Sequence, residues 1–107
     1  MDLATFRNSR AGDGPPDALS QALRALWWDA KGDWQKAHQC AQAQDDAIGA
    51  WVHAYLHRKE GDLDNAGGWY RRAGKAPATG PLEAEWDAIA DALLAPATSP
   101  GPTPPAR

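Results

Sequence analysis

A short pattern that occurs twice constrains the fold of this chain more than any other feature. Residues 32–38 begin with Gly-Asp, and residues 61–67 begin with the same pair about 29 positions later. An amphipathic stretch precedes each copy, at residues 18–31 and 47–60. A unit of helix, Gly-Asp turn and helix that repeats at a fixed period is typical of stacked helical hairpins. The repeat therefore predicts an all-α fold without strands.

Composition divides the chain into three segments. Residues 96–107 are rich in proline and carry no large apolar side chain, so we expect a disordered tail there. Residues 1–14 offer only Leu3 and Phe6 as bulky apolar side chains, and we expect them to be flexible. The helical domain is then expected at residues 15–95. It would hold five helices, arranged as two hairpins and a C-terminal capping helix.

The stretch 47–60 carries apolar side chains on two separate faces. The bulky face consists of Ile48, Trp51, Val52, Tyr55 and Leu56, and the small face consists of Ala47, Ala50 and Ala54. A helix with two apolar faces must be contacted on two sides to remove both from water. We therefore expect this helix in the middle of the stack.

Charge and composition exclude several classes of protein. The net charge is −3 and the basic residues form no long run, which disfavours binding to nucleic acid. No segment approaches the ~18 consecutive apolar residues of a membrane helix, and no apolar signal core is present. The lone Cys40 suits a reducing compartment, so we expect a cytoplasmic protein. Most of the six tryptophans are expected in the core.

The second repeat unit resembles a tetratricopeptide repeat. Small, glycine, large, small, aromatic and small residues follow in the order of that motif, at Ala54, Gly61, Leu63, Ala66, Tyr70 and Ala73. The first unit agrees with the motif at Ala25, Gly32, Trp34 and Ala37. The period of about 29 residues is shorter than the usual 34 or so. The resemblance implies a helical scaffold that binds other proteins.

A second resemblance concerns residues 53–62 and 69–74. Their sequences, HAYLHRKEGD and WYRRAG, are similar to a phrase in small uncharacterised proteins of bacteria and fungi. This resemblance implies no activity.

Trp69 and its neighbouring arginines form the first candidate site. Trp69 lies about 100° around its helix from the packed Tyr70 and is expected at the surface, with Arg72 one turn away and Arg58 nearby. An exposed tryptophan beside arginines is typical of a contact point for an acidic partner. The leading interpretation is thus a non-enzymatic module, without cofactor, that binds a protein or peptide through these three residues together with His53 and His57. Alternatively, these arginines pair with carboxylates of the same hairpin, or the exposed aromatics mediate homodimerisation.

Histidines form the second candidate site. His53 and His57 have the i, i+4 spacing that lets two imidazoles share one metal ion, and Glu60 projects on the same side. His38, from the preceding helix, would supply a third nitrogen. This pattern indicates a protein that binds a metal or small ligand, or an enzyme. The competing interpretation is a set of imidazoles hydrogen-bonded between helices, since Tyr55 and Leu56 stand between the two histidines and the full His-Glu-x-x-His metal motif is absent.

Overall fold

The computed structural model describes residues 1–94, so the expected disordered tail at residues 96–107 lies outside the described residues. Within residues 1–94 the chain forms helices and no strand, which confirms the all-α class. The helices are α1 (Leu3–Ser9), α2 (Gln21–Ala30), α3 (Trp34–Ala43), α4 (Ala47–Glu60), α5 (Leu63–Ala73) and α6 (Leu82–Leu94). The expected count of five helices is therefore one short. None of these helices is both long enough and apolar enough to cross a membrane.

Aspartates and glycines set the ends of the middle helices, as the repeated pattern predicts. The carboxylates of Asp33, Asp46 and Asp62 each accept a hydrogen bond from the backbone N–H three residues later, which caps α3, α4 and α5. Gly61 and Gly74 end α4 and α5 with φ angles of 90° and 71°, a conformation that favours glycine. The Gly61-Asp62 pair thus ends one helix and begins the next.

The first repeat unit begins later than its amphipathic pattern predicts. Ala18 has a φ of 66°, which is outside the right-handed helical region and keeps the first residues of the stretch 18–31 out of the helix. The hydroxyl of Ser20 then accepts a hydrogen bond from the backbone N–H of Leu23 at 3.2 Å. Ser20 therefore caps the N-terminus of α2, and the helix begins at the next residue.

The expectation of a flexible segment over residues 1–14 needs correction, because α1 packs against α6. Phe6 is 0% exposed and stacks on Trp86 with ring centroids 5.6 Å apart. The Arg7 guanidinium pairs with the Asp87 carboxylate at 2.5 Å. The N-terminal segment is therefore joined to the helical core by a buried aromatic ring, an ion pair, and hydrogen bonds from Trp27 and Lys31 of α2 and its C-cap to the carbonyls of residues 9 and 10.

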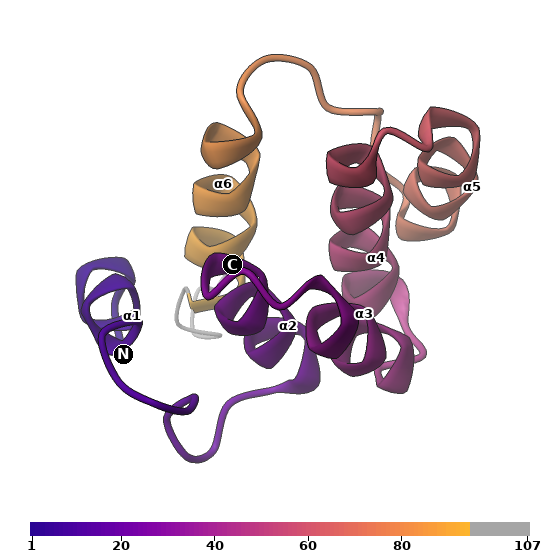
Figure 1. Cartoon of the computed structure of the whole chain (residues 1–107). Helices are drawn as coiled ribbons and strands as arrows, with labels where there is room; N and C mark the ends of the chain where they lie inside the picture. The colour runs from indigo at the N-terminus through magenta and orange to yellow at the C-terminus, as the bar shows by residue number, and fades with distance from the viewer. Residues whose placement is uncertain (95–107) are drawn as a thin grey trace, which may run out of the picture.

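Helix α4 occupies the centre of the molecule, as its two apolar faces predict. It contacts α2, α3, α5 and α6, and Figure 1 shows it between α6 on one side and α5 on the other. The main core includes the buried side chains Phe6, Leu26, Trp27, Val52, Leu56 and Ile89. A smaller cluster of Ala54, Ala66 and Tyr70 joins α4 to α5. Of the six tryptophans, Trp27 and Trp86 are buried, and Trp28, Trp34, Trp51 and Trp69 are half-buried against these clusters.

Candidate metal centre

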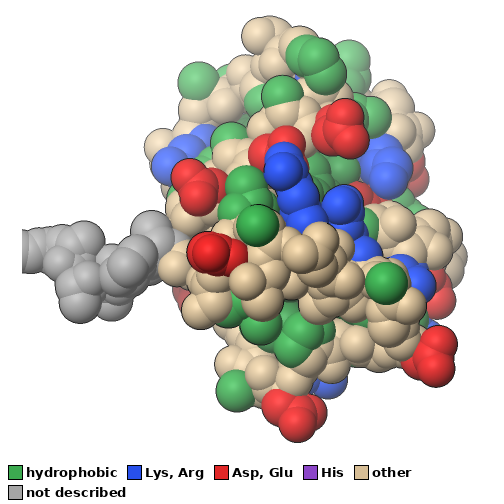
Figure 2. Space-filling view, turned by 90° about the vertical axis from the view of Figure 1, so that its left-hand side faces the viewer, with side chains coloured by type: hydrophobic (Ala, Val, Ile, Leu, Met, Phe, Trp, Pro, Cys, Tyr) green, Lys and Arg blue, Asp and Glu red, His purple; other side chains and the backbone are tan. Residues whose placement is uncertain are grey.

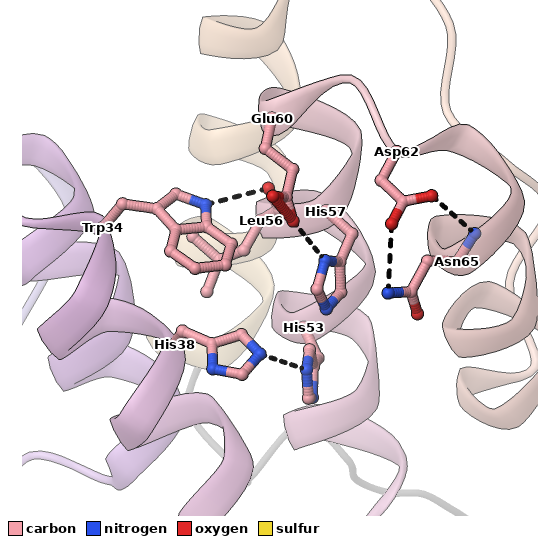
Figure 3. A network of polar contacts seen from close by, with 8 residues as sticks. All are labelled: Trp34, His38, His53, Leu56, His57, Glu60, Asp62 and Asn65. Atoms are coloured by element: carbon pink, nitrogen blue, oxygen red, sulfur yellow. Dashed lines mark hydrogen bonds and ion pairs between the residues drawn. The ribbon is translucent and has the colours of Figure 1, made fainter.

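Three histidines meet where α3 packs on α4. His53 and His57 project from the same face of α4, and α3 brings His38 against them (Figure 3). The Nε2 atoms of His38 and His53 lie 2.9 Å apart, and one ring nitrogen from each of the three histidines lies within 4.8 Å of the others. The structure thus brings together all three histidines that the sequence singled out.

Contacts between the two helices position these rings. The indole N–H of Trp34, at the start of α3, donates a hydrogen bond to the Leu56 carbonyl of α4 at 3.0 Å. One turn further along α3, the His38 ring stacks on the Trp34 ring with centroids 4.9 Å apart. In the sequence Trp34 stands out only as a position that agrees with the repeat motif, and its i, i+4 spacing from His38 is the signal that relates it to the site.

A second tryptophan covers the cluster from α5. The Trp69 ring stacks on His53 with centroids 3.8 Å apart and planes inclined by 15°. The guanidinium carbon of Arg72 lies 4.8 Å from the centre of the Trp69 ring. Trp34 and Trp69 therefore flank the cluster, in which His53 and His57 are buried and His38 is half-buried.

The Glu60 carboxylate contacts Nδ1 of His57. Its Oε2 atom lies 2.6 Å from Nδ1 of His57, and Figure 3 shows the carboxylate directed at that ring. When His57 donates its Nδ1–H to this carboxylate, Nε2 is left with a lone pair for a metal. Asp62 caps α5 instead, accepting hydrogen bonds from the backbone N–H and the side-chain amide of Asn65. Glu60 lies outside the group formed by the three imidazoles and contacts His57 alone among them.

Burial keeps the central imidazoles neutral. His53 is 3% exposed, and burial, with smaller contributions from the nearby charges of His38, His57 and Arg72, lowers its pKa to about 4. Burial also lowers the pKa of His38 below its ordinary value. Since a metal ion binds only the unprotonated imidazole, both rings are in the metal-binding form at pH 7.

The depressed pKa of His53 predicts that acid destabilises the fold. Between pH 6.5 and about 4 the unfolded chain holds a proton on His53 that the folded protein excludes. The unfolded state then binds more protons, so the free energy of unfolding falls as the pH falls, by on the order of 2 kcal/mol from this group. Urea denaturation at pH 7.0, 5.5 and 4.5 measures this loss.

The variant His53→Gln separates this contribution from those of the carboxylates. It removes the titrating ring, so its stability should change less with pH than that of the unaltered protein. Equal pH dependence in both proteins would show that His53 does not resist protonation in the folded state.

The arginines of the first candidate site are divided between two places. Arg72 lies beside Trp69, and its exposed guanidinium pairs with Asp45 at 3.4 Å. Arg58 pairs with the buried Glu85 at 2.9 Å and also donates to the carbonyl of Gly80. No motif in the sequence marks Glu85, whose only local signal is its place in the first turn of α6.

No protein-family model, curated protein or solved structure matches the chain significantly. The resemblances to a tetratricopeptide repeat and to small uncharacterised proteins stay predictions. The function of the histidine cluster must therefore be inferred from its own geometry.

Proposed function

We propose that this protein binds a divalent late first-row transition metal ion, such as Zn²⁺, through His38, His53 and His57. The observation that carries the proposal is the approach of three ring nitrogens, from two helices, to within 4.8 Å of one another. Imidazole nitrogen suits zinc, copper and nickel, whereas magnesium and calcium take oxygen ligands. The contact between Glu60 and His57 is the carboxylate–histidine pairing that commonly supports such ions.

The distance between the Nε2 atoms of His38 and His53 is close to the nitrogen spacing in a tetrahedral zinc site. Zinc–nitrogen bonds of about 2.0–2.1 Å place the ligand nitrogens of a tetrahedron roughly 3.3 Å apart. The 2.9 Å between the Nε2 atoms of His38 and His53 is shorter, so an ion would replace their hydrogen bond and separate the two rings by a few tenths of an ångström. Within residues 1–94 no fourth histidine, cysteine or carboxylate joins this group, which leaves the fourth position to water or another small donor.

Binding of a protein partner has less support from the geometry. His53 and His57 are buried, Arg58 is held by Glu85, and Trp69 is half-buried against His53. Of the residues that were expected to contact a protein partner, Arg72 is the exposed one. The proposed scaffold of tetratricopeptide-like hairpins is compatible with a metal ion between its helices, because stacked hairpins serve many functions.

Titration of the untagged, metal-free protein with Co²⁺ tests the proposal. We expect binding of one ion per chain, a visible absorption band of tetrahedral cobalt, and quenching of the fluorescence of Trp34 and Trp69, whose rings stack on the cluster. Replacing His57 by alanine should lower the affinity at least 100-fold or so, because a direct ligand is lost. Glu60→Gln should lower it about 10–100-fold, since it removes a supporting carboxylate.

Asp64→Asn is the matched control for charge, because Asp64 is an exposed acid of the neighbouring helix that lies outside the cluster. Its affinity for Co²⁺ should equal that of the unaltered protein. Weak binding of several ions, or equal affinities in the His57→Ala and Asp64→Asn variants, would refute a metal centre and leave the histidines as a hydrogen-bonded helix contact.

A further inference from the structure

A second concave site lies away from the histidines, where the end of α1 meets α2, α4 and α6. It is a cavity of about 330 Å³ whose walls include Arg10, Asp29, Tyr55, Lys59, Leu82 and Trp86. Figure 2 views the molecule from the side of α1 and α6, and Lys and Arg side chains gather near the centre of that face. The cavity has no residue in common with the metal centre, and its volume is within the range of small-molecule sites.

A buried carboxylate forms the polar end of the cavity. Asp29 is 4% exposed, and its two oxygens accept hydrogen bonds from the Tyr55 hydroxyl at 2.8 Å and from the Lys59 ammonium at 2.7 Å. Burial and the neighbouring carboxylate raise the pKa of Tyr55, so its hydroxyl keeps the proton that it donates. Both oxygens of Asp29 thus have hydrogen-bond donors. The ammonium group of Lys59 has three N–H donors and gives one of them to Asp29, so two are left for a ligand.

A second cation lies at the cavity without a carboxylate partner. The guanidinium carbon of Arg10 lies 5.2 Å from the centre of the Trp86 ring, and its Nε–H donates to the Arg7 carbonyl at 2.9 Å. Among residues 1–94 no carboxylate lies within ion-pair distance of Arg10. The second acid on the cavity wall besides Asp29, Glu83, is exposed to water, which screens its charge.

The remaining wall is apolar. Trp86 is held in place by the stacked Phe6 ring and by a hydrogen bond from its indole N–H to the Leu26 carbonyl at 2.9 Å. Leu82 extends this wall at the start of α6. A rigid aromatic wall beside two cations suits a ligand with an apolar body and an anionic group.

We propose that this cavity binds a small organic carboxylate, with its carboxylate between Arg10 and Lys59 and its apolar part against Trp86 and Leu82. The guanidinium presents paired N–H donors that match the two oxygens of a carboxylate. Lys59 adds a second charged donor while it stays paired with Asp29. This site is independent of the proposed metal centre.

Titration of the ¹⁵N-labelled full chain with benzoate, followed by NMR, tests this site, with benzyl alcohol as the neutral probe of similar shape. Benzoate should shift the indole N–H signal of Trp86 and bind at least about tenfold more tightly than benzyl alcohol, because charge-assisted hydrogen bonds hold its carboxylate. Arg10→Gln should lower the affinity for benzoate about tenfold.

Arg7→Gln is the matched control, because it removes the same charge nearby from a residue that pairs with Asp87 outside the cavity. It should change the affinity for benzoate less than about twofold. Equal binding of the two probes, equal effects of the two variants, or no shift of Trp86 at 50 mM benzoate would each overturn the proposal.

Discussion

Replacing Phe6 by alanine should lower the free energy of unfolding by about 3–5 kcal/mol, the usual cost of truncating a buried aromatic residue. The Phe6 side chain is fully buried and covers one face of Trp86. Its removal opens a cavity between α1 and α6 that the short helix α1 can close only by shifting as a whole. A loss of this size is a large fraction of the stability of so small a domain.

Urea denaturation of the full chain measures this effect, and Asn8→Ala is its control. Asn8 is exposed on the same helix, so the control variant should stay within about 0.5 kcal/mol of the unaltered protein. If the alanine variant does not fold, Phe6→Leu provides a milder truncation at the same position. Unchanged stability of the Phe6 variants would mean that α1 does not contribute to the core.

Replacing Glu85 by alanine should also cost about 3–5 kcal/mol, for an electrostatic reason. The side chain of Glu85 is 5% exposed and that of Arg58 is 13% exposed, so their ion pair is shielded from water. Glu85 also accepts a hydrogen bond from the Tyr70 hydroxyl at 2.6 Å. Without the carboxylate, the half-buried guanidinium of Arg58 keeps only the Gly80 carbonyl, and the buried hydroxyl of Tyr70 loses its acceptor.

Glu83→Ala is the matched control for Glu85→Ala, because Glu83 is an exposed acid of the same helical turn. Urea denaturation should show a change within about 0.5 kcal/mol for the control variant. The further variant Arg58→Leu, made together with Glu85→Leu, should recover part of the loss, since it removes the uncompensated charge. Equal losses in the Glu83 and Glu85 variants would show that the buried pair does not stabilise the fold.

Short-range signals explain why several helices were predictable. The caps at Asp33, Asp46 and Asp62 act on N–H groups three residues away, and the glycine at position 61 acts on its own turn. Interactions over so few residues depend little on the remaining chain, so they can be recognised in the sequence. Helix α1 was missed because it places only Phe6 and the partly buried Leu3 against the core, and two apolar residues are too few to establish a periodic pattern.

The candidate metal centre was predictable in part. The i, i+4 spacing put His53 and His57 on one face of α4, because a helical turn holds 3.6 residues. The approach of His38 to His53 depends on how α3 packs on α4, including the hydrogen bond from Trp34 to the Leu56 carbonyl. The contact of Glu60 with His57 depends on the side-chain rotamers that this packing leaves available.

By itself the sequence determined the all-α class, the positions of α3, α4 and α5, and the identity of the three histidines. The tertiary structure decided which charged and aromatic residues meet: Arg58 with Glu85, Lys59 with Asp29, and Trp69 with His53. The physical reason is the range of the interactions. Hydrogen bonds and caps within a helix join neighbours along the chain, whereas these pairs form only after burial of apolar side chains has set how the helices pack.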